Sequence, residues 1–251
     1  MRRKYYLTTF ILLSGVCALA LQPPADSSGL TLPKKKNTPA ITMRLHSMGL
    51  FSYMGKVVNY SPAADILFTY TTQSGWGVSA FKVVDVRDVH SHNNFAFALI
   101  YKSFHIGERL TITPNIGAAL EQQNAFADHG SDLIAMLTTS FRLNQNLVVD
   151  HNAMFTNLVF EPVYSDWINR FRLIYSKGHW DATGVLWHNN GLIDGANYFS
   201  TGASVFYNRI SLGKRVWMGG GVTAIFTTNQ SNPEQPHHKK GIQFTAAITI
   251  K

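Results

Sequence analysis

Polar and apolar residues alternate along most of the chain from residue 40 to its end. In segment 108–122, Leu110 and Ile112 share one face, and Thr111 and Thr113 share the other. A period of two residues is typical of a β-strand with one apolar and one polar face, and no segment beyond residue 40 shows helical periodicity. We therefore predict an all-β, antiparallel fold of about twelve strands. Their ranges are about 40–53, 63–73, 75–86, 92–106, 108–122, 131–143, 146–157, 167–177, 179–189, 196–209, 215–228 and 240–250.

Two of the predicted strands are ambiguous. In 75–86 and 179–189, both faces carry apolar residues, so the count falls to ten if these strands are misassigned.

The connections between the predicted strands alternate in length down the whole chain. The short ones lie at 73–75, 107–109, 144–146, 177–179 and 210–214, and the long ones at 54–62, 86–92, 122–131, 157–167, 189–196 and 228–240. Short periplasmic turns, longer outer loops and an even number of strands are typical of an outer-membrane barrel. A soluble β-sandwich is the alternative, but it gives no reason for alternating loop lengths.

Aromatic residues lie toward the ends of the predicted strands, where a barrel places two interfacial girdles. These residues are Trp76, Tyr101, Phe104, Phe141, Phe155, Trp167, Tyr175, Trp180, Tyr198, Tyr207 and Phe226.

The last strand is expected to close the barrel. Ile242, Phe244 and Ile248 would face lipid, and Gln243 and Thr245 would face the lumen. Pairing of this strand with the first leaves no strand edge with unsatisfied backbone groups in hydrocarbon.

On this pattern, residues 40–251 resemble the porin-like outer-membrane β-barrel proteins of Gram-negative bacteria. The resemblance rests on strands and loops, and not on a specific motif. In that class the last strand usually serves as the assembly signal and ends on an aromatic residue, whereas this chain ends on Ile250 and Lys251. The resemblance implies an outer-membrane location and contact with membrane lipid and the barrel-assembly machinery. We expect a monomer.

The N-terminal segment resembles an export signal. Arg2, Arg3 and Lys4 precede an apolar run that ends at a small-residue cleavage site near Ala20, so residues 1–20 are predicted to be a cleaved signal peptide. Acylation of Cys17, as in a lipoprotein, is the alternative. Residues 21–39 form a Pro- and Lys-rich periplasmic leader, and residues 40–251 form a single barrel domain.

Composition and charge exclude several functions. The net charge is +8, of which removal of the signal peptide leaves +5, and only 14% of residues are charged. Basic patches interleaved with stacking aromatics are missing, so nucleic acid is not an expected partner. No cofactor is expected either, because Gly219–Gly221 lies mid-strand without the following helix that a phosphate loop needs. These glycines are expected to leave room for a bend or for an aromatic ring of a neighbouring strand.

Histidines suggest a metal site at first sight. His90, His92, His237 and His238 fall in predicted outer loops, but they lack cysteine partners and a fixed ligand spacing. We therefore predict solvated loop histidines and no metal site.

Charged residues of both signs are assigned to the lumen, where they must pair with one another or stay hydrated. Register counting places Asp150 opposite Arg172 and Asp181 about one diagonal away from Arg172. This Asp150–Arg172–Asp181 cluster either stiffens the barrel interior or forms a constriction that selects a polar solute. The lumen set is Arg44, His46, Asp65, Lys82, Lys102, Glu121, Asp132, Arg142, Asp150, Asn152, Arg170, Arg172 and Asp181.

An enzyme is a further alternative. Some twelve-stranded outer-membrane barrels are phospholipases with a His-x-Ser pair on the lipid-facing surface and an Asn on the next strand. None of His90, His151 and His188 has a serine two positions on, so none of these three histidines has the adjacent nucleophile that such a pair requires. We expect no enzyme.

The sequence therefore predicts a narrow, mildly cation-repelling channel for small polar or anionic solutes. The candidate lining residues are Arg44, His46, Glu121, Asp150, Arg170, Arg172 and Asp181. The alternative is a closed barrel whose outer loops at 86–92 and 228–240 bind an extracellular ligand or partner.

Overall fold

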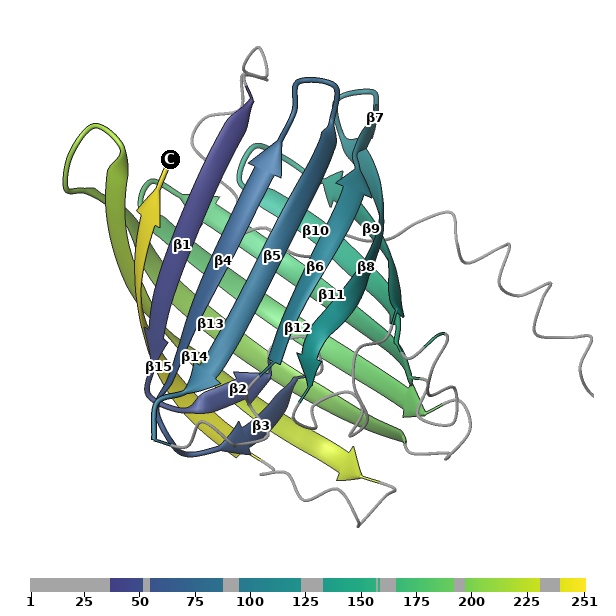
Figure 1. Ribbon diagram of the computed structural model, residues 1–251, viewed down its shortest axis with the longest axis vertical. Coiled ribbons are helices and arrows are strands. Elements are labelled where there is room, and N and C mark those ends of the chain that lie inside the picture. Colours follow the sequence, from purple (N-terminus) through teal and green to yellow (C-terminus); the bar gives the residue numbers. More distant parts are fainter. Residues whose placement is uncertain are drawn as a thin grey trace, which may run out of the picture.

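The computed structural model forms one closed antiparallel barrel (Figure 1). It describes residues 37–51, 55–87, 95–122, 133–156, 158, 166–191, 197–230 and 240–251. The predicted signal peptide (1–20) and most of the predicted leader (21–39) lie outside these residues. Among the residues described, no helix is long and apolar enough to span a membrane.

The strands follow one another around the wall in chain order, and the two ends of the chain close it. β1 (Thr38–His46) pairs with β15 (Lys240–Ile250) on one side and with β4 (Ala63–Thr71) on the other. The remaining strands are β5 (Trp76–Asp85), β6 (Phe95–Lys102), β7 (Phe104–Ile106), β8 (Leu110–Gln122), β9 (Leu133–Arg142), β10 (Leu147–Phe155), β11 (Asp166–Lys177), β12 (Trp180–Gly191), β13 (Asn197–Ser211) and β14 (Val216–Gln230).

The predicted count of twelve strands is confirmed for the described part of the chain. β6 and β7 both pair with β8, so they occupy one position in the wall and together correspond to the predicted strand 92–106. The two ambiguous strands are β5 and β12, and both are regular members of the barrel.

The alternation of connections is also confirmed. The tight turns between β4 and β5, β7 and β8, β9 and β10, β11 and β12, and β13 and β14 share one end of the barrel, here called the short-turn end. The other connections leave from the opposite end, here called the long-loop end, which is the lower end in Figure 1.

Outside the bulges, residues alternate between the exterior and the interior of the barrel. In β15, Ile242 and Phe244 are about 60% exposed on the exterior, whereas Gln243 and Thr245 are buried inside. The exterior is therefore apolar, and the predicted faces of the last strand are confirmed.

The interior is not polar throughout. Leu67, Phe81 and Phe97 point inward from β4, β5 and β6, and Met154 and Ile168 point inward from β10 and β11 in the same buried cluster. These side chains fill part of the interior, as expected in a barrel of small diameter. This packing explains why strand β5 carries apolar residues on both faces.

Four residues face the opposite way from the prediction. Lys82 lies on the exterior, because Val83 is the residue that opposes the inward Asp65 across β4 and β5. Lys102 also lies outside, where its Nζ is 5.4 Å from the centroid of the Trp76 ring. Conversely, two predicted girdle residues, Tyr101 and Tyr198, point inward.

The first predicted strand, 40–53, is wrong at its end. β1 stops at His46, and the chain then forms a separate hairpin from β2 (Gly49–Phe51) and β3 (Lys56–Asn59). This hairpin lies at the long-loop end of the barrel (Figure 1).

Candidate functional site

The interior of β9, β10 and β11 carries the ion pair that the sequence suggested. Asp150 lies directly opposite Arg172 across β10 and β11. The Arg172 guanidinium donates from Nη2 to Asp150 Oδ2 at 2.7 Å and from Nε to Asp150 Oδ1 at 2.9 Å. Two parallel hydrogen bonds make this a bidentate, charge-assisted contact. The Asp150 side chain is only 2% exposed, so the pair is held inside the barrel.

Asp181 lies farther along the barrel from this pair than predicted, and its predicted position one diagonal from Arg172 is wrong. The tight turn between β11 and β12 pairs Lys177 with Trp180, which places Asp181 opposite Ser176 and four residues along β11 from Arg172. Asp181 instead accepts a hydrogen bond of 2.7 Å from Asn208 and lies 3.4 Å from an Arg209 nitrogen.

The position of Arg209 has a local cause. Arg209 lies in a bulge of β13 and has a φ angle of 67°. A β-bulge re-aims the side chain that it carries, and here it directs the guanidinium toward Asp181 near the short-turn end.

Two further arginines lie close to the Asp150–Arg172 pair in register. Arg170 points inward opposite Asn152, and Arg142 points inward opposite Val148. We call Arg142, Asp150, Arg170 and Arg172 the arginine patch. Arg170 is 5% exposed, and Nε of Arg142 is buried without a hydrogen-bond partner.

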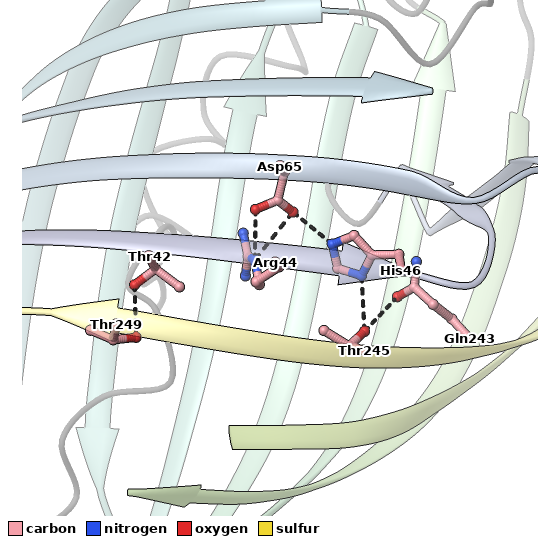
Figure 2. A network of polar contacts seen from close by, with 7 residues as sticks. All are labelled: Thr42, Arg44, His46, Asp65, Gln243, Thr245 and Thr249. Atoms are coloured by element: carbon pink, nitrogen blue, oxygen red, sulfur yellow. Dashed lines mark hydrogen bonds and ion pairs between the residues drawn. The ribbon is translucent and has the colours of Figure 1, made fainter. Parts of the chain in front are cut away.

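A second polar network crosses the line where the two ends of the chain meet (Figure 2). Arg44 Nε on β1 donates to Asp65 on β4 at 2.8 and 3.1 Å, and His46 Nε2 lies 2.7 Å from Asp65 Oδ2. The other ring nitrogen of His46 is 2.9 Å from the Thr245 hydroxyl on β15. We call this the seam network, because it ties β4, β1 and β15 together. It also includes Thr42, Gln243 and Thr249.

Glu121 cannot be placed in either group. Its backbone pairs with Ala96 across β8 and β6, but its side chain lies outside the described residues, as does Asp132. Most of the two predicted functional loops, 86–92 and 228–240, also lies outside them.

The β2–β3 hairpin occupies part of the interior at the long-loop end, which sequence reasoning missed. Met48 and Val57 are buried against Trp187 of β12 and Ile225 of β14. Gln243 Nε2 donates to the Met48 carbonyl at 2.8 Å. Gly55 lies so close to the Trp187 ring that a Cβ there would clash with it. The apolar residues Met48 and Val57 and the intervening Gly55 were the features of the sequence that could have indicated this hairpin.

The exterior of β10 and β11 carries a polar pair. His151 Nε2 is 2.9 Å from Asn169 Oδ1, and the His151 ring stacks on Phe171 with a centroid distance of 4.1 Å. A histidine beside an asparagine of the next strand is one part of the residue set that the hydrolase alternative requires. However, Ala153 occupies the position two residues after His151, so it supplies no hydroxyl there.

The glycine run of β14 has the packing role predicted for it. A Cβ on Gly221 would lie 2.5 Å from Cγ of Phe206 on β13, so the missing side chain makes room for an aromatic ring. Among the described residues, no group of His, Cys, Asp or Glu side chains could hold a metal ion.

No protein-family model and no curated protein matches this chain. Solved structures do. The NanC porin superposes with a TM-score of 0.53 at 8% identity, over 85% of this chain and 100% of that protein. An outer membrane channel from Pseudomonas putida F1 superposes with a TM-score of 0.54 at 9% identity, over 92% of this chain and 99% of that protein.

The chain has the fold of an outer-membrane β-barrel. At such low identity the likeness concerns the fold alone, and the solute of neither relative transfers to this chain. Both of these similar structures are described as a porin or a channel.

Proposed function

We propose that this protein is an outer-membrane β-barrel that forms a narrow channel for small polar or anionic solutes. The observation that carries the proposal is the arginine patch, which gathers three guanidinium groups and one carboxylate on the inner face of β9, β10 and β11. Positive side chains that line a passage repel cations and attract anions.

The exterior supports the membrane location. Large apolar side chains cover it, including Phe244 and Ile242 on the last strand and Ile100 on β6. In addition, Trp76 and Trp180 are more than half exposed on the exterior at the short-turn end. An apolar band flanked by aromatic residues is what a barrel presents to lipid and its interface.

The interior supports a passage that is narrow rather than wide. Apolar side chains of β4–β6 and of β9–β11 meet in one buried cluster that fills part of the interior. The β2–β3 hairpin fills another part of the interior at the long-loop end. A small polar solute would pass the arginine patch without meeting a wide aqueous pore.

The same packing favours a second candidate function. A barrel filled by its own side chains is closed, and its outer loops would then bind an extracellular ligand or partner. The buried contacts of Met48 and Val57 against Trp187 are the observation in favour, because they act as a cover at the long-loop end.

Single-channel conductance of the refolded chain without residues 1–20, in a planar bilayer, distinguishes the two. The channel predicts discrete conductance steps, and Trp187→Ala is expected to raise the step size severalfold because the hairpin loses its packing partner. Leu186→Ala, which truncates an exposed exterior residue of the same strand, is the matched control and should leave the steps unchanged. If neither the folded wild-type protein nor folded Trp187→Ala produces conductance steps in the bilayer, the channel is ruled out.

A further inference from the structure

The arginine patch differs from the other charged clusters of the interior in its charge balance. Asp65 faces one arginine, Arg44, together with His46, and Asp181 faces one arginine, Arg209. In contrast, the described inward side chains of β9, β10 and β11 include three arginines and one carboxylate, Asp150.

The flanking strands do not restore the balance among the described side chains. The inward residues of β8 next to β9 are Thr111, Thr113, Asn115 and Gly117, which carry no charge. On the other side, the inward acid of β12 is Asp181, which contacts Arg209. Among the described side chains, the patch therefore holds more arginines than carboxylates.

Arg142 has an unused hydrogen-bond donor in its side chain. Its Nε is buried and has no hydrogen-bond partner. A guanidinium stays charged at any physiological pH, and a buried donor without a partner costs free energy. An oxyanion is the chemical partner that a guanidinium edge fits best, because two N–H groups can bind two oxygens at once.

Neutral hydrogen-bonding groups surround the arginines. Thr138, Ser140 and Asn152 are buried on the inner face of β9 and β10, and Ser140 lies opposite Asp150 in register. Hydroxyl and amide groups of this kind can donate to further oxygens of a bound anion.

The three arginines also follow one another along the barrel. Arg142 is opposite Val148, Arg172 is opposite Asp150 and Arg170 is opposite Asn152, so they occupy successive inward rows. Rows two residues apart are separated by about 7 Å along a strand. An anion could thus move from one row to the next without leaving the positive region.

We infer that the arginine patch is a binding site for one small oxyanion, either a carboxylate or a phosphate, with Arg142 as its principal ligand. Arg172 stays with Asp150, and Arg170 adds positive charge on the far side of that pair. The inference deepens the proposed function, because it names the class of solute that the channel would carry.

Equilibrium dialysis of radiolabelled inorganic phosphate, and separately of acetate, against the refolded barrel in detergent tests the site without requiring conductance. We expect saturable binding of at least one probe, and a loss of affinity of about tenfold or more in Arg142→Gln, since a charge-assisted pair is lost. Arg209→Gln is the matched control, because Arg209 also lies inside the barrel but faces Asp181, and it should change the affinity less than twofold. Heat-dependent gel mobility shows whether each variant is folded.

The outcomes separate the site from the channel. Saturable binding that Arg142→Gln abolishes supports the site even if the bilayer is silent, and in that case only the channel fails. Failure of both probes to saturate wild-type protein, or an equal loss in Arg142→Gln and Arg209→Gln, would overturn the site whatever the conductance shows.

Discussion

The seam network and the arginine patch use the same elements in different ways. In each, the side chain of a buried aspartate accepts hydrogen bonds from an arginine at the directly opposed position on the neighbouring strand. Asp65 also contacts His46, which continues to Thr245 on the last strand, so the seam network extends over three strands. Asp150 contacts Arg172, and it is the one carboxylate among the four residues of the arginine patch. In the proposed channel, the seam network holds the wall together, whereas the arginine patch provides positive charge for a solute.

The seam has a reason to be strongly connected. β1 and β15 are far apart in sequence, so closing the barrel orders nearly the whole chain between them. Contacts that form only when β1 meets β15, such as His46 with Thr245, stabilise the closed barrel. They do not stabilise a hairpin of two strands that are consecutive in the chain.

The largest expected effect on stability comes from removing the carboxylate of the seam. Asp65→Ala leaves Arg44 and His46 without their shared partner, and we expect a loss of about 3 kcal/mol, the lower end for a broken buried ion pair because Arg44 is partly exposed. Denaturant unfolding of the barrel in lipid vesicles, followed by tryptophan fluorescence, measures it. Unfolding at the wild-type denaturant concentration would show that the seam network does not stabilise closure.

Asp150→Asn is expected to separate stability from binding in the patch. The variant loses the ion pair with Arg172, but the asparagine oxygen can still accept one hydrogen bond from the guanidinium. We therefore expect a loss of about 2 kcal/mol, as for a hydrogen bond to a charged group. Phosphate affinity should rise severalfold, since the site gains net positive charge. Weaker phosphate binding in a folded Asp150→Asn barrel would contradict the assigned role of the patch.

The smallest expected effect concerns a neutral contact of the seam. The hydroxyls of Thr42 and Thr249 are 3.1 Å apart, and Thr42→Val should cost about 1 kcal/mol, as for an ordinary hydrogen bond. The double variant Thr42→Val with Thr249→Val should recover part of this loss, because neither hydroxyl is then left unpaired. A double variant with fully additive losses would show that the two hydroxyls do not interact.

The sequence alone predicted much of the wall, because alternation of polar and apolar residues directly reports which face a strand buries. Phe244 and Thr245 illustrate this, being exposed and buried as expected. Asp150 and Arg172 could be paired by counting because β10 and β11 pair regularly over their full length.

The failures of prediction have specific causes. Lys82 was misplaced because its strand is apolar on both faces, and the apolar interior cluster that causes this comes from strands distant in sequence. Arg44 and Asp65 were not paired because the β2–β3 hairpin intervenes and makes register counting from the loop length meaningless. Asp181 was placed too near Arg172 because the tight turn pairs Lys177 with Trp180 and so puts Asp181 opposite Ser176. Its contact with Arg209 was missed because the bulge that aims Arg209 has no signature in the alternation pattern.

The reversal potential of the refolded barrel under a KCl gradient across a planar bilayer tests the central claim most directly. If the arginine patch lines a conducting path, the potential will have the sign of anion preference and will move toward zero in Arg142→Gln. A reversal potential with the sign of cation preference, or one that Arg142→Gln leaves unchanged, would contradict an anion pathway along the patch.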